Sequence, residues 1–392
     1  MNSKNIFEQA KRNVLLHKHI CLVNDLYNPL GIIRSLAREG ISPIVLVYGK
    51  DIHLVSNSKY VGELHKFETA ESAFEFMVSH YMNEKYKPFV YNDSDRVTLL
   101  LDSKYEELKE HFYFCNSKGN ISPLMQKLEQ TRLAEESGLI IPREELLKVG
   151  SLPQTLRYPV ITKAATSATG KAWKDQTFIC HDEKELQEAY KKIHVEDILV
   201  QEYVQKKNEL CIEGICINSG EQVAMPYVCE YFRFTDSSFG SYIYITPSDK
   251  HKGLLEKIQM LLQRMNYSGI FEIEFIEGKD GNLYFMEVNL RNSGWSYPYT
   301  YGGFNLPVRW AISTLCGQIY NDDFVPKPYF TAMQDVSDLL ECLKYKRITF
   351  LQWLKDFHRV DCCLVYDKKD WKPFWAEISA SGKRKLNKFF RK

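Results

Sequence analysis

No run of apolar residues in this chain approaches the ~20 needed for a membrane-spanning helix. The first residues, MNSKNIFEQAKRN, are polar and charged, so we do not expect a signal peptide. The ten cysteines show no CxxC spacing: Cys211 and Cys216 lie five apart, and Cys362 and Cys363 are adjacent. Neither spacing suits a common zinc site. We therefore expect most cysteines to be buried free thiols and the protein to be cytoplasmic.

A strong charge of either sign is also missing. The net charge is +1 over 392 residues, and no basic stripe carries interleaved aromatics, so we expect no nucleic-acid partner. No GxGxxG follows the first predicted strand, which disfavours a dinucleotide site. Hydrophobic residues at 44% and charged residues at 26% are typical of globular cores and surfaces. The length predicts two or three domains.

Strand and helix patterns alternate in residues 19–95, which predicts a small parallel sheet with crossover helices. We expect strands at 19–23, 43–47 and 89–91 and helices at 30–38 and 70–82. Asp25 and Asp95 follow predicted strands, where ligands bind in open α/β sheets. They could instead cap the next helices. Capping is the preferred interpretation for Asp95, and both remain open for Asp25.

Further along, a helix is predicted within 121–142, ending at Gly138. Residues 158–235 are rich in strands around one helix at 183–193, and another helix is expected at 251–265. Residues 326–392 are mixed, and the stretch TFLQWLKDF at 349–357 predicts a helix whose apolar face needs a partner.

The most informative stretch is GIFEIEFIEGKDGNLYFMEVNLR, residues 269–291. Its Asp280-Gly281 pair predicts a two-residue hairpin turn. This register places Glu274 opposite Glu287 and Glu272 opposite Asn289, with Phe275 opposite Met286 on the apolar face. Like charges directly opposite each other destabilise a sheet.

A hard divalent cation would offset that repulsion, because carboxylate and amide oxygens are preferred ligands of Mg²⁺. Mg²⁺ also keeps positions open for substrate phosphates. Arg291 continues along the same face and could meet another negative group. The alternative is an exposed hairpin face, on which glutamates are ordinary.

A second informative stretch begins with the strand PVITK, which ends at Lys163 and runs into the small-residue loop AATSATG and Lys171. Small residues let backbone N–H groups approach phosphates closely, and a flanking lysine adds charge. Residues 198–204, ILVQEYV, form an apolar strand whose end could read an adenine edge. Glu209 follows at a distance suited to ribose hydroxyls. Taken alone, a surface loop beside a solvated lysine is the preferred interpretation of the small-residue stretch.

In this order, these features resemble the ATP-grasp superfamily, with the ExNxR run at 287–291 as the most specific element. The resemblance implies phosphate contacts, a lid over the triphosphate, an adenine hinge, a ribose acceptor and magnesium ligands. The implied phosphate contacts are Lys127 and Lys163, and the implied lid residues are Thr169 and Lys171. The adenine hinge would be Glu202, Tyr203 and Val204, and the ribose acceptor Glu209. The magnesium ligands would be Glu274, Glu287 and Asn289. It also implies that Arg291 steadies an acyl phosphate and that Lys163 takes part in catalysis. The lid departs from many relatives in having only one glycine, Gly170.

The resemblance covers roughly residues 119–325 and implies an α/β (α+β) fold. We expect a pre-ATP-grasp parallel α/β domain at 1–118 and a two-lobed ATP-grasp domain with antiparallel sheets at 119–325. The lid subdomain is expected at about 155–205, and a small C-terminal segment at 326–392. Residues 289–307 are most similar to the carboxylate–amine ligase and D-aspartate ligase-like branch.

The implied activity is ATP-dependent ligation: a small-molecule carboxylate is activated as an acyl phosphate and joined to an amine, in cell-envelope or polysaccharide biosynthesis. The implied cofactors are ATP and two Mg²⁺ ions, for which Mn²⁺ could substitute. The expected assembly is a homodimer. Three alternatives remain: a carbamoyl-phosphate-synthase-like enzyme using bicarbonate and ammonia, a non-catalytic nucleotide-binding protein, and an interaction protein with no ATP site.

Substrate residues are less well defined. Arg233 could bind the substrate carboxylate or be a solvated strand-edge arginine, and Asp25 and Arg34 are further candidates. The tail SGKRKLNKFFRK has six basic residues in its last ten. Such a tail could contact an anionic membrane. A disordered, solvated end is the preferred interpretation.

Overall fold

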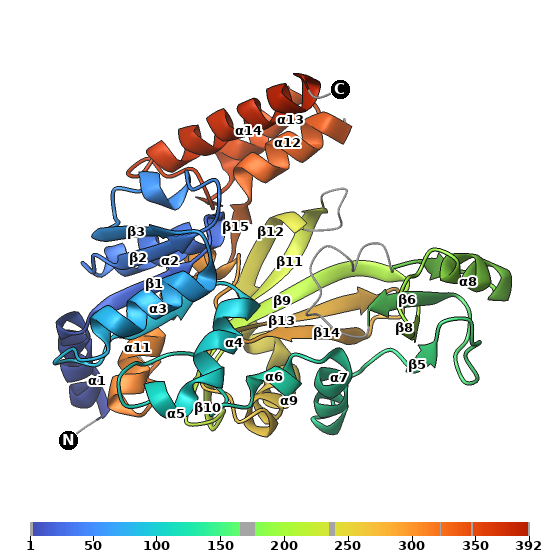
Figure 1. Cartoon of the computed structure of the whole chain (residues 1–392), viewed down its shortest axis with the longest axis horizontal. Coiled ribbons are helices and arrows are strands. Elements are labelled where there is room, and N and C mark those ends of the chain that lie inside the picture. Colours follow the sequence, from blue (N-terminus) through green and yellow to red (C-terminus); the bar gives the residue numbers. More distant parts are fainter. Residues whose placement is uncertain (1–2, 165–176, 235–239, 322, 346–347, 391–392) are drawn as a thin grey trace.

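The computed structural model describes residues 3–164, 177–234, 240–321, 323–345 and 348–390. Three sheets organise them. Figure 1 shows a parallel sheet and a small antiparallel sheet towards opposite ends of the long axis, with an eight-stranded sheet between them. This mixed α/β arrangement confirms the predicted fold class.

The first sheet has four parallel strands in the order β3-β2-β1-β4. Strand β1 (His19–Val23) is buried along its whole length, as expected for a parallel strand covered on both faces. Cys21 and Val23 enter one core, and Ile20 and Leu22 enter another. The other elements are β2 (Ile44–Tyr48), β3 (Glu63–Phe67), β4 (Phe89–Asn92), α1 (Ser3–Asn13), α2 (Tyr27–Arg38), α3 (Ala70–Tyr81), α4 (Asp95–Ser103) and α5 (Tyr105–Leu108). The sequence patterns missed β3, whose residues are only partly buried.

The small sheet is antiparallel, in the order β5-β8-β6-β7. Helix α8 packs on it and is capped by Asp182, whose side chain accepts a hydrogen bond from the Glu185 N–H. Its elements are β5 (Glu144–Lys148), β6 (Val160–Ala164), β7 (Ile179–Cys180), β8 (Asp197–Glu202) and α8 (Glu183–Tyr190).

The large sheet runs β14-β13-β9-β11-β12-β15-β16, and β10 pairs with β9. The strands are β9 (Lys206–Ile217), β10 (Gln222–Ala224), β11 (Tyr227–Phe234), β12 (Gly240–Pro247), β13 (Gly269–Gly278), β14 (Leu283–Asn289), β15 (Phe330–Met333) and β16 (Cys362–Cys363). The associated helices are α6 (Ile121–Leu124), α7 (Lys127–Glu136), α9 (Lys252–Arg264), α10 (Ser296–Tyr301) and α11 (Leu306–Cys316). Helix α7 ends near Gly138, which has a φ of +79°.

The β13–β14 hairpin confirms the predicted pairs Glu274–Glu287 and Glu272–Asn289. The predicted pair Phe275–Met286 is wrong, because the register shifts after Glu274 and Phe275 pairs with Phe285. Four residues, 279–282, separate the strands, so the turn is also longer than predicted. The irregularity leaves Met286 out of the ladder and turns it to the pocket described below.

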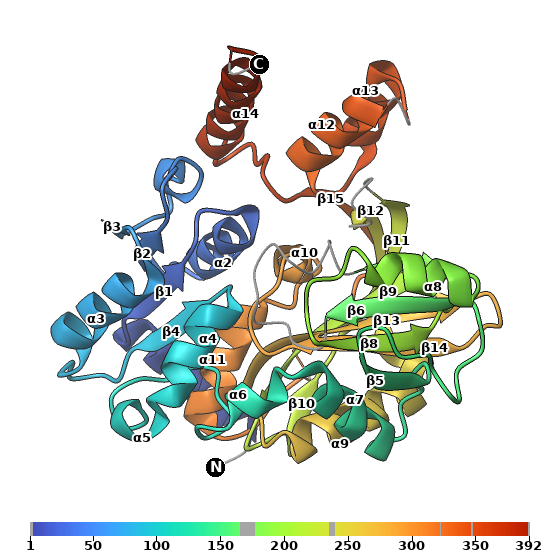
Figure 2. The same ribbon diagram turned by 45° about the vertical axis from the view of Figure 1, so that its right-hand side comes forward.

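The last part of the chain contains α12 (Asp335–Tyr345), α13 (Phe350–Arg359) and α14 (Lys372–Phe390). Figures 1 and 2 both place these helices at one end of the molecule, away from the N-terminus. The predicted helix at 349–357 is confirmed, with Thr349 as its cap. The preference for a disordered tail is wrong: Phe374 and Ile378 pack on the main core, and the helix continues from this anchored turn to Phe390.

No helix within the described ranges is long and apolar enough to cross a bilayer. The nine described cysteines are free thiols, and all but Cys316 and Cys363 are buried, as predicted. They are distributed over the parallel sheet, the small sheet, the large sheet and the C-terminal segment.

Candidate active site

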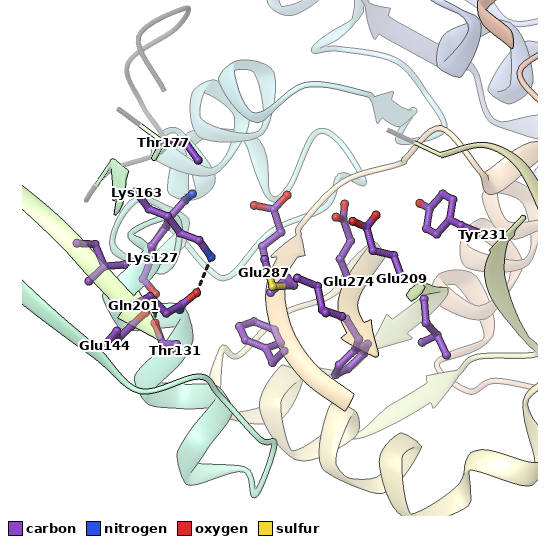
Figure 3. A pocket seen from close by; sticks show the side chains of 16 residues that line it. Lys127, Thr131, Glu144, Lys163, Thr177, Gln201, Glu209, Tyr231, Glu274 and Glu287 are labelled. Carbon is purple, nitrogen blue, oxygen red and sulfur yellow. Dashed lines mark hydrogen bonds between the residues drawn. The ribbon is translucent and has the colours of Figure 1, made fainter. Parts of the chain in front are cut away.

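A pocket of ≈ 280 Å³ lies between the β13–β14 hairpin and the small sheet (Figure 3). Its volume is at the lower end of the range for small-molecule sites. Carboxylates from β9 and the hairpin line one side, and lysines from α7 and β6 line the other (Figure 3). Apolar side chains lie between them: Leu199, Leu210, Phe275, Ile276, Phe285 and Met286. An apolar surface with a few convergent charged groups is typical of a binding site.

The acidic side is built by cross-strand pairing. We call Glu272, Glu274, Glu287 and Asn289 the acidic platform. Glu274 and Glu287 sit directly opposite each other and both line the pocket. The side-chain amide of Asn289 donates to Glu272 Oε2 at 3.0 Å and to Glu274 Oε1 at 3.2 Å. Asn289 therefore joins the two carboxylates of β13 from the neighbouring strand.

The carboxylates of the platform repel one another. Burial raises the pKa of Glu274 well above its ordinary value, and the charges of Glu272 and Glu287 raise that pKa further. Burial also raises the pKa of Glu272. On β9, Glu213 lies directly opposite Glu272 and is fully buried. Burial and then the charge of Glu272 raise the pKa of Glu213 to about 8.

These donors fit a magnesium ion that shares its coordination with phosphate oxygens. Among the residues described, no three His, Cys, Asp or Glu side chains form a group that holds a cation by itself. Mg²⁺ commonly takes one or two carboxylates and completes its shell with phosphates and water. Glu274 and Glu287, with repulsion still to be relieved, match that pattern.

The basic side depends on two lysines from different elements. Lys127 is the first residue of α7, and Lys163 lies near the end of β6. Gln130 fixes α7 against β14 by exchanging two 3.1 Å hydrogen bonds with the backbone of Val288. The helix carrying Lys127 is therefore attached to the strand carrying Glu287.

Lys163 is held by a short polar chain. Its Nζ donates to Gln201 Oε1 at 2.6 Å, and Gln201 Nε2 donates to Glu144 Oε2 at 2.7 Å (Figure 3). Burial lowers the pKa of Lys163 to about 8, and the charge of Lys127 acts in the same direction. Two ammonium groups held near each other in a partly desolvated pocket favour an anionic ligand.

Arg291 lies just beyond the platform, at the start of the loop after β14. Its Nη2 donates to Asn289 Oδ1 at 3.1 Å, and its Nε donates to Asp95 Oδ1 at 2.7 Å. Burial opposes its charge, but Asp95 and Glu272 raise the pKa of Arg291. The helix cap expected of Asp95 is made instead by Ser94, which accepts a hydrogen bond from the Val97 N–H. Asp95 thus links the parallel sheet to Arg291.

Of the residues expected to contact the nucleoside, the ribose acceptor lines the pocket and the adenine hinge does not. Glu209 lines it, and Lys206 donates to Glu209 at 2.7 Å. Glu202, Tyr203 and Val204 are not among its lining residues. The N–H groups of Glu202 and Tyr203 donate to the carbonyls of Arg143 and Pro159. Thr169 and Lys171 lie outside the described residues.

Two residues expected to bind substrate lie elsewhere. The Asp25 carboxylate accepts the backbone N–H groups of His53, Leu54 and Val55 at 2.6–2.8 Å. Arg34 is 1% exposed and donates to Asp370 and to the carbonyls of Leu364 and Val365. Both side chains therefore tie the parallel sheet to other segments, and neither lines the pocket.

Arg233 is also paired within the protein. It donates to Asp338 Oδ2 at 2.6 Å and also to Asp356, so it joins β11 to α12 and α13. The expectation of a solvated strand-edge arginine is wrong, because its side chain is 11% exposed. Arg233, which was also expected to bind substrate, is not among the residues that line the pocket.

The sequence interpretation missed Glu144, Gln201, Thr131 and Glu213. Gln201 had a signal, because it interrupts an otherwise apolar strand, but its role depended on pairing β8 with β5 and β6. Glu213 lies on β9, four residues after Glu209. Ser293 donates to Glu213 at 2.8 Å, and Ser296 donates to its other oxygen. Glu213 thereby anchors the turn after Arg291.

Part of the chain matches a known domain family. Residues 127–298 match the model of the ATP-grasp domain. The chain therefore contains an ATP-grasp domain.

Among curated proteins, the chain is 24% identical to the D-aspartate ligase of Enterococcus faecium over 290 residues, covering 69% of this chain and 68% of that protein. It is 24% identical to N5-carboxyaminoimidazole ribonucleotide synthase of Staphylococcus epidermidis over 240 residues. That match covers 57% of this chain and 60% of the synthase, less than two thirds of its length.

Two solved structures share the fold. N5-carboxyaminoimidazole synthetase from Staphylococcus aureus has a TM-score of 0.59 and 18% identity, covering 84% of this chain and 85% of that one. The L-amino acid ligase from Bacillus licheniformis has a TM-score of 0.58 and 14% identity, covering 80% and 79%. At these identities the similarity concerns the fold alone.

Proposed function

We propose that this protein is an ATP-dependent ligase that activates a carboxylate as an acyl phosphate and joins it to an amine. One observation carries the proposal: Glu274 and Glu287 face Lys127 and Lys163 across the same pocket. A polyphosphate bound there with divalent metal would lie between acidic and basic groups. Charge stabilisation and positioning are the main protein contributions to phosphoryl transfer.

In this proposal the two lysines hold the phosphates, and Glu274, Glu287 and Asn289 would hold two Mg²⁺ ions, for which Mn²⁺ could substitute. Bound Mg²⁺ supplies Lewis acidity to the phosphoryl oxygens. Glu209 takes the ribose hydroxyls, and Val204 with Glu202 and Tyr203 forms the adenine hinge. Thr169 and Lys171, which belong to the implied lid, add contacts to the phosphates.

Arg291 stabilises the negative charge that develops when the amine attacks the acyl carbon. Its contacts with Asn289 and Asp95 orient the guanidinium beside the platform, at the edge nearest the parallel sheet. The substrates would therefore meet between the large sheet and residues 1–118, the proposed pre-ATP-grasp domain. The proposed ATP-grasp domain spans 119–325, with the remaining residues forming a C-terminal segment.

We further propose an amino acid as one substrate, in cell-envelope or polysaccharide biosynthesis in the cytoplasm, with the chain acting as a homodimer. The similarity to a D-aspartate ligase supports this substrate class. The similarity to N5-carboxyaminoimidazole ribonucleotide synthases supports a second candidate, in which bicarbonate is the activated carboxylate.

The test is phosphate release from MgATP by the purified chain, with amino acids supplied singly and in pairs and bicarbonate supplied separately. We expect release to depend on one carboxylate and to rise with one amine, with the amide product identified by mass spectrometry. Release that depends on bicarbonate instead would replace the amino acid proposal. Absence of ATP binding would overturn the ligase proposal, and nucleotide binding without turnover across the panel would favour a regulatory protein.

A further inference from the structure

The C-terminal segment differs in charge from the rest of the chain. Residues 326–392 contain 15 Lys and Arg but eight Asp and Glu, a net charge of +7, so the other residues carry −6. Two of these acids, Asp338 and Asp356, are already paired with Arg233, and Asp370 is paired with Arg34. The basic residues of this segment therefore outnumber the acidic groups left to balance them.

The same segment exposes large apolar side chains. Leu351 is 76% exposed, Trp375 58% and Trp371 52%, and Phe350 and Leu354 are also exposed. We call these five residues the C-terminal apolar surface. Exposed apolar side chains gathered in one region indicate an interaction site more strongly than scattered ones.

An underlying line of rings connects the two parts of this surface. Ring centroids are 6.1 Å apart for Phe350–Trp353, 4.9 Å for Trp353–Phe357 and 6.3 Å for Phe357–Phe374. Phe374 then contacts Trp375 at 5.4 Å. The N-terminal part of α14 therefore contacts the C-terminal part of α13, so the two helices that carry the exposed residues are joined.

From these observations we propose that the C-terminal segment docks the protein on a membrane rich in anionic phospholipid. Trp, Phe and Leu side chains would enter the boundary between headgroups and acyl chains, and the basic residues that follow along α14 would meet the negative surface. Tryptophan is favoured at that depth because its ring is amphipathic. Helices α13 and α14, which carry these residues, lie at one end of the molecule, away from the N-terminus (Figures 1 and 2).

Charge decides against the other occupants. A symmetric dimer through this surface would bring two segments of net charge +7 together, and their repulsion would oppose it. A nucleic acid would match the charge but would leave the aliphatic Leu351 and Leu354 without an apolar partner. An anionic bilayer satisfies both the charge and the apolar surface.

The experiment is flotation of the full chain with vesicles of phosphatidylcholine alone or mixed with phosphatidylglycerol. We expect binding to the mixed vesicles only, release by high salt, and quenching of tryptophan fluorescence by brominated acyl chains. Replacing Lys383, Arg384 and Lys385 by Glu should lower binding at least about tenfold. The pair Leu351→Ser and Leu354→Ser should lower it by a similar factor.

Leu15 and Leu16 provide a matched control, because they are 56% and 53% exposed near the N-terminus. Their replacement by Ser should leave vesicle binding unchanged. Equal binding to both vesicle types, or loss of binding in the control pair alone, would overturn the proposal. So would a dimer in the absence of lipid that becomes monomeric in the Leu351→Ser, Leu354→Ser variant. None of these outcomes depends on whether the ligase reaction is correctly assigned.

Discussion

Two regions of this molecule bury charged side chains, and they differ in how those charges are balanced. Where the parallel sheet meets the C-terminal segment, Arg34 is paired with Asp370. Where β11 of the large sheet meets the same segment, Arg233 is paired with Asp338 and Asp356. On the acidic platform, Glu272 and Glu274 share one amide donor from Asn289 and face further carboxylates. Completed pairs hold segments together, whereas the carboxylates of the platform repel one another.

The largest effect should come from removing a platform carboxylate. Glu287→Ala should lower the rate of ATP turnover by about 10³-fold, or about 4 kcal/mol in the activation free energy. Folding should change little, because the substitution relieves the repulsion with Glu274. Steady-state phosphate release and thermal unfolding measure the two effects. Glu277→Ala, on β13 but paired with Lys207, is the control and should keep full activity. A Glu287→Ala enzyme with normal turnover would contradict the metal-binding role.

Where Arg34 pairs with Asp370, we expect a substitution to lower stability and leave the rate of turnover unchanged. Arg34→Met should lower the free energy of unfolding by about 3 kcal/mol, because Asp370 would remain buried without its partner. The kcat of the folded enzyme should stay normal. Chemical denaturation measures the loss, and Arg38→Met on the same helix is the control, since Arg38 is exposed. A large fall in kcat with unchanged stability would instead support the substrate role first expected of Arg34.

A smaller effect should appear in the pH dependence of kcat/KM for ATP, through the charge of Lys163. Its pKa is lowered to about 8, so the ammonium charge is lost as the pH rises through that value. kcat/KM for ATP should therefore fall about tenfold per pH unit above this point, as expected for loss of one essential protonated group. Lys163→Arg should remove this limb. Gln201→Glu should move it to higher pH by favouring the charged lysine, and an unchanged limb in both variants would exclude Lys163 as its source.

The smallest effect concerns the stability of the ligand-free protein. The pKa of Glu213 is raised from 4.5 to about 8, so the native state binds more protons than the unfolded state in this interval. Between pH 4.5 and 8, the contribution of Glu213 to the free energy of unfolding should therefore be greatest at the lower pH. It should fall by about 1 kcal/mol or more as the pH rises towards 8. Glu213→Gln should flatten the dependence, whereas Glu277→Gln should not. Urea unfolding at several pH values gives the slopes, and parallel slopes for wild type and Glu213→Gln would show that Glu213 is not responsible.

The sequence was most informative where chemistry and periodicity were local. Glu274 and Glu287 were paired correctly because the hairpin turn and the alternation of charged residues lie within one continuous stretch. The shift after Glu274 was not predictable from alternation, since an irregular strand depends on packing against the neighbouring β9. Lys127 and Lys163 were expected from the resemblance, and the structure brings both to the pocket.

Residues whose function depends on distant partners were harder to interpret. Arg34 and Asp370 are 336 positions apart, so the sequence could not show that they form a buried pair. Gln201 likewise needed Glu144 from a separate strand. The basic tail was misjudged because its high charge favours solvation, while the helix depends on aromatic packing at its other end.

The buried cysteines give each layer of the protein its own chemical reporter. Cys21 lies in the parallel sheet, Cys180 in the small sheet, Cys216 in the large sheet and Cys362 at its far edge. Burial raises the pKa of these thiols, so an alkylating reagent meets little thiolate while the layers stay closed. The order in which these sites become labelled under mild denaturant would therefore show which layer opens first, without any introduced probe.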